Sequence, residues 1–249
     1  MQENLIIEES WTKIFNILRR KKYIYVKNEA RTKQFLTAVC WTMRNAARWR
    51  ALPECFGKWN SVFKRFNEWT KNKVWDFLFE ECVQDPDLEH VMIDSTFIKA
   101  HASSAGYRYK MPEAIGRSRG GFTTKVHALV DALGLPLRFI ITGGNVSDIS
   151  IAPTLCRSLF STQVLADKGY DSDKFRNFLK QNECVPVIPG RSNRKTPVIY
   201  DKILYKERNG VERFFGKIKH FHRISMRHEK TARNYQALLN IVGALAWLQ

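Results

Sequence analysis

The segment that most constrains this chain is Tyr205–Lys219, which reads YKERNGVERFFGKIK. Four polar side chains recur in it at offsets of 3, 4 and 7 residues (208−205, 212−208, 219−212): Tyr205, Arg208, Glu212 and Lys219. In an α-helix with about 3.6 residues per turn, these offsets place all four side chains on one stripe. The spacing therefore predicts a helix that presents a carboxylate flanked by cations.

The apolar residues within and next to this segment gather on a different face of this predicted helix. They are Ile203, Val211, Phe214, Ile218 and Phe221. We expect this face to pack against the protein while the charged stripe stays accessible. A solvated helix face that carries only ion pairs is the alternative interpretation, and the stripe alone does not exclude it.

Two aspartates upstream favour a functional interpretation. LEHVMIDSTFIKAH reads as a buried strand with Asp94 in its middle, and STQVLADKGYDS reads as a strand that ends at Asp167. A carboxylate inside a buried strand is costly unless a partner compensates its charge. Asp171 lies four residues further (171−167) and is an alternative to Asp167, although the strand-end position favours Asp167.

Asp94, Asp167 and Glu212 are separated by 73 residues (167−94) and 45 residues (212−167). Together they form a set of three carboxylates, and carboxylate oxygens are the ligands that Mg²⁺ and Mn²⁺ prefer. The three residues are therefore our candidates for a metal-dependent active site.

At this point the chain resembles the DDE transposases of bacterial insertion sequences, in particular the insertion-sequence-four and insertion-sequence-five families. Their C-terminal signature is Tyr, two residues, Arg, three residues, Glu, six residues, Lys, which Tyr205–Lys219 fits without a gap. MIDST around Asp94 and LADKGYDS around Asp167 match the other two acidic blocks. RWRALPECFGKWNSVFKRFNEW, at Arg48–Trp69, is similar to the helical region before the catalytic domain, so the resemblance runs from about Thr32 to the end.

The resemblance implies a transposase that binds the terminal inverted repeats of an insertion sequence and catalyses metal-dependent strand cleavage and strand transfer. Asp94, Asp167 and Glu212 would be catalytic and would hold two Mg²⁺ or Mn²⁺ ions, and no protein side chain would act as a covalent nucleophile. The partner would be double-stranded DNA, including the terminal repeats and the target. Because two ends react together, a homodimer or larger assembly on DNA is expected.

The order of the predicted elements indicates an α/β fold with two domains. Residues 1–87 form an all-helical, helix-turn-helix-like domain, with predicted helices at Glu9–Lys21, Arg31–Arg44 and Ser61–Glu81. A polar linker at Gln84–His90 leads into a catalytic domain at residues 88–249.

Within the catalytic domain, three strands precede an alternation of helices and strands, which is the order of a ribonuclease-H-like fold. The strands are expected at Leu88–Lys99, Gly121–Val130 and Pro136–Thr142, with a tight turn at Asp131–Gly134. They are followed by a helix at Asp148–Phe160, the strand ending at Asp167, a helix at Ser172–Asn182, the strand CVPVIP and the Glu212 helix. This topology would place Asp94 beside Asp167, with Glu212 above them.

The charge of the chain indicates a polyanionic partner, with nucleic acid as the first candidate and an anionic membrane as the second. The sequence has 41 Lys and Arg against 24 Asp and Glu, a net charge of +17, and residues 190–249 alone carry 13 cations and 4 acids. The candidate DNA-contacting residues are Tyr205, Arg208, Lys219, Arg44, Arg48, Arg50, Lys64, Arg65, Arg117, Arg119, Lys125, Arg191, Arg194 and Lys195.

Several residues near the predicted site have a second interpretation. Lys125 and His127 share one face of their strand and are second-line candidates. Asp148 is either a site residue or the N-cap of the next helix. The Gly-, Ser- and Arg-rich segment Ser103–Gly120 is either a loop that DNA orders or an ordinary connection.

Two alternative functions stay open. One is a catalytically silent, transposase-derived DNA-binding protein. The other rests on His220-Phe221-His222, which matches the metal-binding pair of single-strand relaxases, but alternate residues of a helix point apart and do not chelate one metal.

The location expected for the protein is the bacterial cytoplasm, in association with the nucleoid. The first ten residues, MQENLIIEES, lack the apolar core of a signal peptide, and the longest apolar stretch near the end is too short to cross a bilayer. Five widely spaced cysteines form no C-x-x-C pair and are expected to be buried, reduced thiols.

Overall fold

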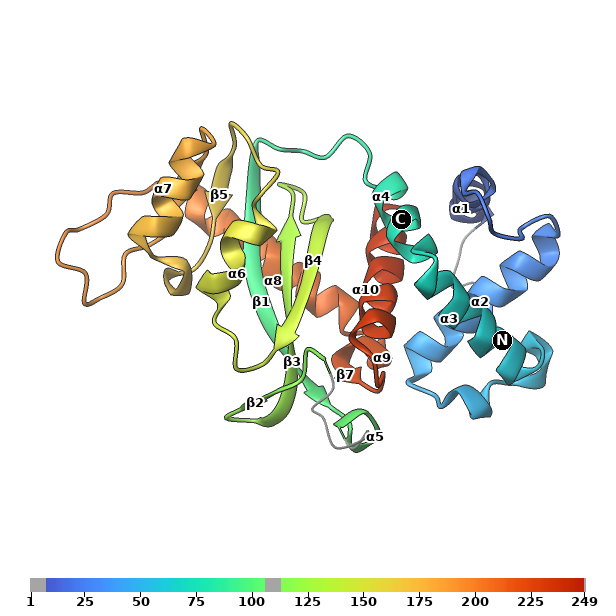
Figure 1. The fold of residues 1–249 in the computed structure, drawn as a ribbon. Helices are drawn as coiled ribbons and strands as arrows, with labels where there is room; N and C mark the ends of the chain where they lie inside the picture. The colour runs from blue at the N-terminus through green and yellow to red at the C-terminus, as the bar shows by residue number, and fades with distance from the viewer. Residues whose placement is uncertain (1–7, 106–112, 249) are drawn as a thin grey trace. The chain divides into compact units, whose positions relative to one another are not determined.

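The computed structural model describes residues 8–105 and 113–248. The chain divides into two compact units, which we call the helical unit and the sheet unit (Figure 1). The helical unit comprises residues 1–84, 100–112 and 218–249, and the sheet unit comprises residues 85–99 and 113–217.

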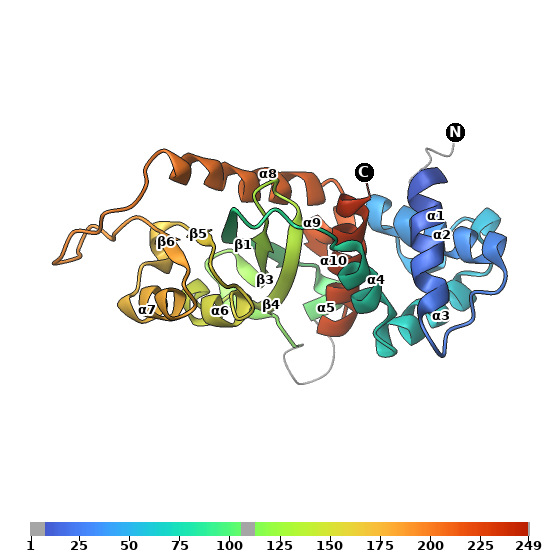
Figure 2. The ribbon, with the colours of Figure 1, turned by 90° about the horizontal axis from the view of Figure 1, so that it is seen from above.

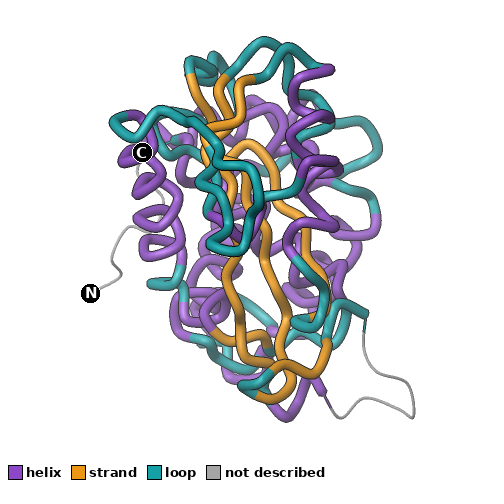
Figure 3. Tube along the Cα trace, turned by 90° about the vertical axis from the view of Figure 1, so that its left-hand side faces the viewer, coloured by secondary structure: helices purple, strands orange, loops and turns teal. Residues whose placement is uncertain are grey.

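The sheet unit is built on a mixed β-sheet whose strands run side by side (Figure 3). Strands β1 (His90–Ala100), β3 (Gly121–Val130) and β4 (Pro136–Gly143) form the predicted antiparallel meander. The short β2 (Gly116–Ser118) also pairs with β3. On the other side of β1, β5 (Gln163–Leu165) and β6 (Val185–Val187) add in parallel, so the order is β2-β3-β1-β5-β6 with β4 beside β3.

Helices cover the two faces of this sheet (Figure 2). Helices α6 (Asp148–Leu155) and α7 (Asp173–Gln181) share a buried core with Val91 and Ile93 of β1. Helix α8 (Asn209–Ile218) lies on the opposite face. Because successive side chains of a strand point to opposite faces, Met92 and Asp94 both belong to the α8 face.

The turn between β3 and β4 is tight, as predicted. The Asp131 carboxylate accepts a hydrogen bond from the Leu135 backbone N–H at 2.7 Å, and Gly134 has a φ of 80°. This left-handed backbone favours glycine, which carries no Cβ. The carboxylate and the glycine together bring β4 back alongside β3.

The helix predicted across Tyr205–Lys219 is wrong at both ends. Residues Leu204–Arg208 form a 3₁₀ helix, η4, and α8 ends at Ile218, so the four stripe residues do not lie on one continuous α-helix. The Asp201 side chain accepts hydrogen bonds from the N–H groups of Ile203 and Leu204 at 2.8 and 3.0 Å, a local turn that competes with the helix. Ile203 is consequently 80% exposed instead of packed.

The helical unit has an aromatic core. Its main helices are α1 (Glu8–Arg20), α2 (Glu29–Asn45), α3 (Trp59–Lys71), α4 (Val74–Cys82) and α10 (Ala232–Trp247). Shorter elements are η1 (Trp49–Ala51), η2 (Glu54–Phe56), α5 (Ala102–Ala105), α9 (His222–Ser225) and β7 (Met226–Arg227). The rings of Phe35, Trp69 and Trp75 contact one another with centroids 5.0 to 6.1 Å apart. Such offset and edge-on contacts are favourable for aromatic pairs.

The helix predicted at Ser61–Glu81 is two helices. The chain breaks between α3 and α4 at Lys73, whose φ of 52° is left-handed and does not continue an α-helix. The break turns Trp75 into the core, where it is completely buried. The packing of this tryptophan overrides the helical propensity of the segment.

The C-terminal residues join the helical unit, which differs from the division expected at residue 87/88. Ser10 donates a hydrogen bond to the Leu248 carbonyl at 2.7 Å, and Asn234 donates one to Asn67 at 2.7 Å. Arg223 also donates to the Ala47 carbonyl. These contacts link α10 and its neighbours to helices that lie more than 150 residues away in sequence.

In the described part of the chain, no helix combines the length and the apolar character that a membrane span needs. Four of the five cysteines are buried, whereas Cys55 is exposed, so the expectation of five buried thiols is wrong at this position. Residues 106–112 of the predicted Ser103–Gly120 loop lie outside the described residues, and its ends form α5 and β2.

Candidate active site

Asp94 lies on β1, and Asp167 lies two residues after the end of the adjacent strand β5. Strands β1 and β5 pair in parallel, with Met92 opposite Leu165. Two residues further along each strand direction come Asp94 and Asp167, which are therefore level with each other. The continuously buried part of β1 ends at Ile93, and Asp94 is the first partly exposed residue after it.

A close approach of α8 to β1 places Glu212 above these aspartates. A Cβ atom on Gly210 would lie 2.8 Å from both Sδ and Cε of Met92, so this turn of α8 lies directly against the strand. Glu212 follows in the same turn and its side chain is 51% exposed. The glycine lets the helix come close enough for a carboxylate on α8 to approach Asp94 on β1.

Arg208 lies between two of the three carboxylates. Its Nη1 is 3.2 Å from Oδ2 of Asp94, and its Nη2 donates to Oε1 of Glu212. The guanidinium also lies 5.8 Å from the ring centroid of Tyr205, which in turn contacts Tyr200 edge-on at 5.5 Å. Three of the four signature residues thus belong to one cluster.

The pKa of Asp94 is raised to about 6, chiefly by burial, and the negative charges of Asp167 and Glu212 act in the same direction. The Ser95 N–H, which donates to Asp94 at 2.7 Å, and the Arg208 guanidinium act in the opposite direction. Asp167 and Glu212 are thus close enough to act on the Asp94 carboxylate, and a partly buried carboxylate with acidic neighbours favours a cation.

The Asp171 carboxylate accepts hydrogen bonds that hold the surrounding structure together. Its carboxylate accepts hydrogen bonds from Arg176 Nε at 2.9 Å, Arg194 Nη1 at 3.0 Å and the Arg191 N–H at 2.8 Å. Burial acts to raise the pKa of Asp171, but these donors outweigh it and hold the pKa below its ordinary value. Asp167, by contrast, accepts a hydrogen bond from the local N–H of Gly169 at 2.8 Å.

Asp148 belongs to a second polar cluster behind Asp94. Its Oδ1 lies 2.7 Å from Ser95 Oγ, 3.1 Å from Lys125 Nζ and 3.6 Å from His127 Nδ1. The N-cap of α6 is Ser147, so the interpretation of Asp148 as a helix cap is wrong. Ser95 is the residue next to Asp94, and this cluster therefore braces the strand that carries the central carboxylate.

Lys125 faces this cluster more than solvent. Its side chain is 6% exposed, and Nζ donates to the Val146 carbonyl at 2.7 Å and lies 4.6 Å from the ring centroid of Phe97. In the structure its ammonium group compensates the charge of Asp148. A direct DNA contact by Lys125 would require the side chain to leave these partners.

Sequence reasoning missed Tyr170 and Ser95. Tyr170 is 2% exposed, and its hydroxyl has no hydrogen-bond partner among the residues that the structure describes. Burial, followed by the charges of Asp148 and Asp94, raises the pKa of Tyr170 far above its ordinary value. Tyr170 lies within ADKGYDS, next to the second acidic block. No sequence pattern predicts that Tyr170 lies under the site. Its position follows only from the nearby charges of Asp94, Asp148 and Asp167 in the structure.

The remaining candidate cations are dispersed. Arg191 donates to the carbonyls of Lys168 and Gly169, at 3.3 and 2.9 Å, and holds the loop behind Asp167. Lys219 follows the end of α8 and belongs to the helical unit. Exposed candidates in the sheet unit are Arg117, Arg119 and Lys195, and exposed candidates in the helical unit are Arg44, Arg48, Arg50 and Lys64.

Comparison with known proteins identifies the family. Residues 85–247 match the family described as "Transposase DDE domain", and residues 6–79 match "Putative transposase of IS4/5 family". The chain belongs to the DDE transposases of insertion sequences. The resemblance inferred from the three acidic blocks is thereby confirmed.

Two relatives support this assignment of the transposase. This chain is 42% identical over 132 residues to "Putative transposase for insertion sequence element IS6501" of Brucella ovis. The aligned region covers 51% of this chain and 99% of that protein. It is 32% identical over 142 residues to "Putative transposase for insertion sequence element IS402" of Burkholderia cepacia, covering 52% of this chain and 64% of that protein.

A solved structure confirms the fold of the transposase. The piggyBac transposase in a synaptic complex with hairpin DNA aligns with a TM-score of 0.54 at 12% identity, over 98% of this chain and 70% of that chain. At this identity the likeness concerns the fold, which is ribonuclease-H-like with a helical N-terminal region, as predicted.

DDE transposases generally use divalent metal ions, and the donor set here fits such an ion by its chemistry. Asp94, Asp167 and Glu212 supply only oxygen ligands, which are the ligands that Mg²⁺ and Mn²⁺ prefer. Among residues 8–105 and 113–248, however, no three acidic, His or Cys side chains lie at metal-binding distance. Arg208 occupies the space between Asp94 and Glu212, so its guanidinium would have to move aside.

Proposed function

We propose that this transposase binds the terminal inverted repeats of its insertion sequence and catalyses metal-dependent DNA strand cleavage and strand transfer at Asp94, Asp167 and Glu212. The observation that carries the proposal is the parallel pairing of β1 with β5, which puts Asp167, two residues after β5, level with Asp94 on β1, while α8 carries Glu212. These residues are far apart in sequence, and their approach has no evident role in stabilising the sheet, because like charges repel.

In this proposal the three carboxylates hold Mg²⁺ or Mn²⁺, two ions in the full complement. When bound, the metal would neutralise the scissile phosphate and lower the pKa of the attacking hydroxyl. Asp94 contributes the central ligand because it lies between the strand that leads to Asp167 and the helix that carries Glu212.

The other site residues position these ligands and the DNA. Arg208 keeps Asp94 and Glu212 oriented in the absence of substrate, with one guanidinium nitrogen on each carboxylate. It can exchange these carboxylates for a DNA phosphate, which a guanidinium binds well. Ser95 and Asp148 hold β1 in register with the site. No protein nucleophile takes part, so no covalent protein–DNA intermediate forms.

The net charge of +17 supports duplex DNA as the partner, both terminal repeats and target. Joining of two ends calls for at least a homodimer on DNA. In the helical unit, we propose that exposed cations on α2, around η1 and on α3 contact the DNA. They are Arg44, Arg48, Arg50 and Lys64. The proposed location is the bacterial cytoplasm, on the nucleoid.

Nicking and strand transfer on duplexes that carry the element's terminal repeat test the proposal, in the presence of Mg²⁺ or Mn²⁺. Asp94→Asn and Glu212→Gln should abolish product while terminal-repeat binding is retained. Glu207→Gln is the matched control, because Glu207 is an exposed acid in η4, one turn before the site. Tight binding without nicking by the wild type would favour the catalytically silent DNA-binding protein instead, and a covalent adduct would revive the His220 and His222 interpretation.

A further inference from the structure

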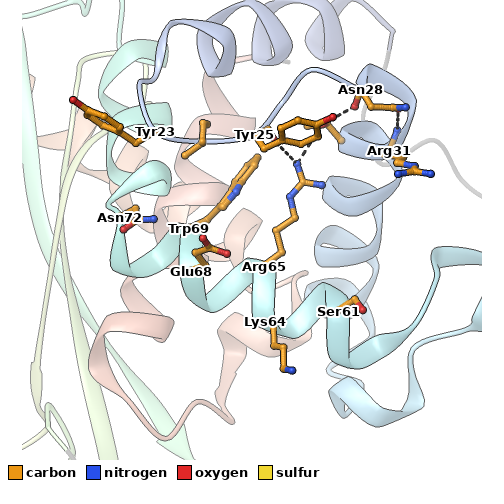
Figure 4. A pocket seen from close by; sticks show the side chains of 12 residues that line it. Tyr23, Tyr25, Asn28, Arg31, Ser61, Lys64, Arg65, Glu68, Trp69 and Asn72 are labelled. Carbon is orange, nitrogen blue, oxygen red and sulfur yellow. Dashed lines mark hydrogen bonds between the residues drawn. The ribbon is translucent and has the colours of Figure 1, made fainter.

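The helical unit contains a pocket that none of the proposed catalytic residues lines. It has a volume of about 420 Å³ and lies between the loop that joins α1 to α2 and the outer face of α3. Figure 4 shows Tyr25 above Arg65, with Tyr23 and Lys64 extending away from the pocket floor. The pocket therefore combines aromatic rings with cations.

The two tyrosines are unusually accessible. Tyr23 is 97% exposed and Tyr25 is 68% exposed, so their rings contribute little to the core. Tyr23 also has a φ of 64°, a left-handed conformation that is costly for a residue with a bulky side chain. Strain of this kind at a residue without packing of its own points to a role in binding.

Arg65 makes the floor of the pocket rigid. Its guanidinium lies 4.4 Å from the ring centroid of Phe35 and 4.8 Å from that of Trp69. It also donates hydrogen bonds to the Tyr25 carbonyl at 3.1 Å and to Thr32 Oγ1 at 3.3 Å. These contacts make Arg65 an anchor of the loop that carries Tyr23 and Tyr25. The guanidinium is therefore engaged within the protein, whereas the sequence led us to expect that Arg65 faces DNA.

The chain around the pocket is strongly basic. Residues 19–33 contain seven Lys and Arg against one acid, Glu29. Arg31 and Lys64 line the pocket itself, together with the amide side chains of Asn28 and Asn72. Proteins bind unpaired nucleotides with cations beside accessible aromatic rings. The rings stack on the faces of the bases, and the cations pair with the phosphates of the backbone.

We propose that this pocket binds a short unpaired stretch of DNA, with its bases on Tyr23 and Tyr25 and its phosphates at Arg31 and Lys64. The proposal rests on the proposed function, and it adds a single-strand site to the helical unit. Fully paired DNA keeps its base faces stacked, so the tyrosines would contact only bases that are already unpaired or that leave the duplex. Such bases occur wherever a DNA end is opened or cut.

Binding of fluorescent DNA to the full chain, measured by anisotropy in EDTA, tests the proposal without catalysis. Three probes are compared: a thymidine oligonucleotide, a paired duplex, and the same duplex with a short unpaired bubble. The wild type should prefer the single strand and the bubble. Tyr23→Gly and Tyr25→Ala should each weaken these two affinities about tenfold and leave the paired duplex unchanged.

Two controls separate binding from folding. Tyr23→Gly removes the backbone strain, so the melting temperature should stay the same or rise while binding is lost. Phe160→Ala removes a ring that is 63% exposed in the sheet unit and should change no affinity. A wild type without preference for unpaired DNA, or variants that bind all probes normally, would overturn the pocket proposal.

The outcome for the pocket is distinguishable from that for the proposed function. If the wild type nicks its terminal repeat but the tyrosine variants bind unpaired DNA normally, the pocket proposal alone fails. If the wild type binds no DNA probe, the proposed function fails as well. If Tyr23→Gly instead abolishes a concentration-dependent dimer and leaves DNA binding intact, the pocket belongs to a protein interface.

Discussion

The guanidinium of Arg208 lies 3.2 Å from the carboxylate of Asp94, a residue 114 positions earlier in the chain. The same guanidinium donates to Glu212, one helical turn later. Arg208 therefore connects a carboxylate of the central strand to a carboxylate of α8. The contact explains why an arginine precedes the glutamate by four residues, because this offset lets one side chain reach both acids.

Replacing Arg208 should damage the site without unfolding the protein. Arg208→Gln removes the cation that opposes the raised pKa of Asp94, so this pKa should increase above about 6. Strand cleavage should fall about a hundredfold, the usual loss when one positioned donor is removed. Cleavage rates from pH 5 to 9 measure both effects, and the acidic limb of the profile should move to higher pH.

Lys206→Gln is the control for this experiment, because Lys206 is an exposed cation of the same 3₁₀ helix. If both variants lose activity equally with an unchanged pH profile, Arg208 acts as a general DNA-binding charge and not on Asp94.

The Asp148 cluster should stabilise the sheet unit. Asp148→Ala leaves the ammonium group of Lys125 buried without its counter-charge, 3.1 Å from where the carboxylate was. We expect a loss of about 2 to 3 kcal/mol in the free energy of unfolding, since uncompensated buried charges are costly. Urea denaturation measures this loss. Lys125→Met combined with Asp148→Ala should recover part of it, and a double variant that is less stable than either single variant would contradict this explanation.

Asp171 should contribute stability and not catalysis. Asp171→Ala removes the acceptor for Arg176, whose side chain is 8% exposed, and should lower the free energy of unfolding by about 3 kcal/mol. The exposed Asp173 also pairs with Arg194, and Asp173→Ala should cost less than about 1 kcal/mol. Cleavage by Asp171→Asn under conditions where it is folded separates the roles. Complete inactivity of a folded variant would identify Asp171 as a ligand.

His127 should make the protein less stable in mild acid. The pKa of His127 is lowered from 6.5 to about 4, chiefly by burial; the charge of Asp148 opposes this shift and that of Lys125 supports it. The unfolded chain therefore takes up a proton below pH 6.5 that the folded protein does not take up until about pH 4. Stability should fall across this window as the pH decreases, because the unfolded state then binds more protons.

Denaturation of wild type and His127→Gln at several pH values between 7 and 4 measures this contribution as a difference. The comparison is needed because Asp94 titrates in the same range with the opposite sign: its pKa is raised in the folded state. The variant should show a shallower loss of stability. Identical slopes would mean that His127 is protonated in the folded protein.

Local sequence patterns were sufficient for the order of the main strands and for the helix that carries Glu212, whereas the role of the three acidic residues stays a prediction. The apolar run of β1, the short apolar strand before Asp167 and the apolar spacing around Glu212 are patterns of a few residues, which depend on neighbours in the chain. The predicted meander and its tight turn are confirmed for the same reason.

Contacts between distant residues decided the rest. The break at Lys73 follows from the burial of Trp75, and the placement of α10 with the helical unit follows from its bonds to residues near the N-terminus. The Arg208–Asp94 contact and the Asp148 cluster join residues more than 20 positions apart. Packing and charge compensation across such distances depend on the assembled fold, so no pattern within one segment predicts them.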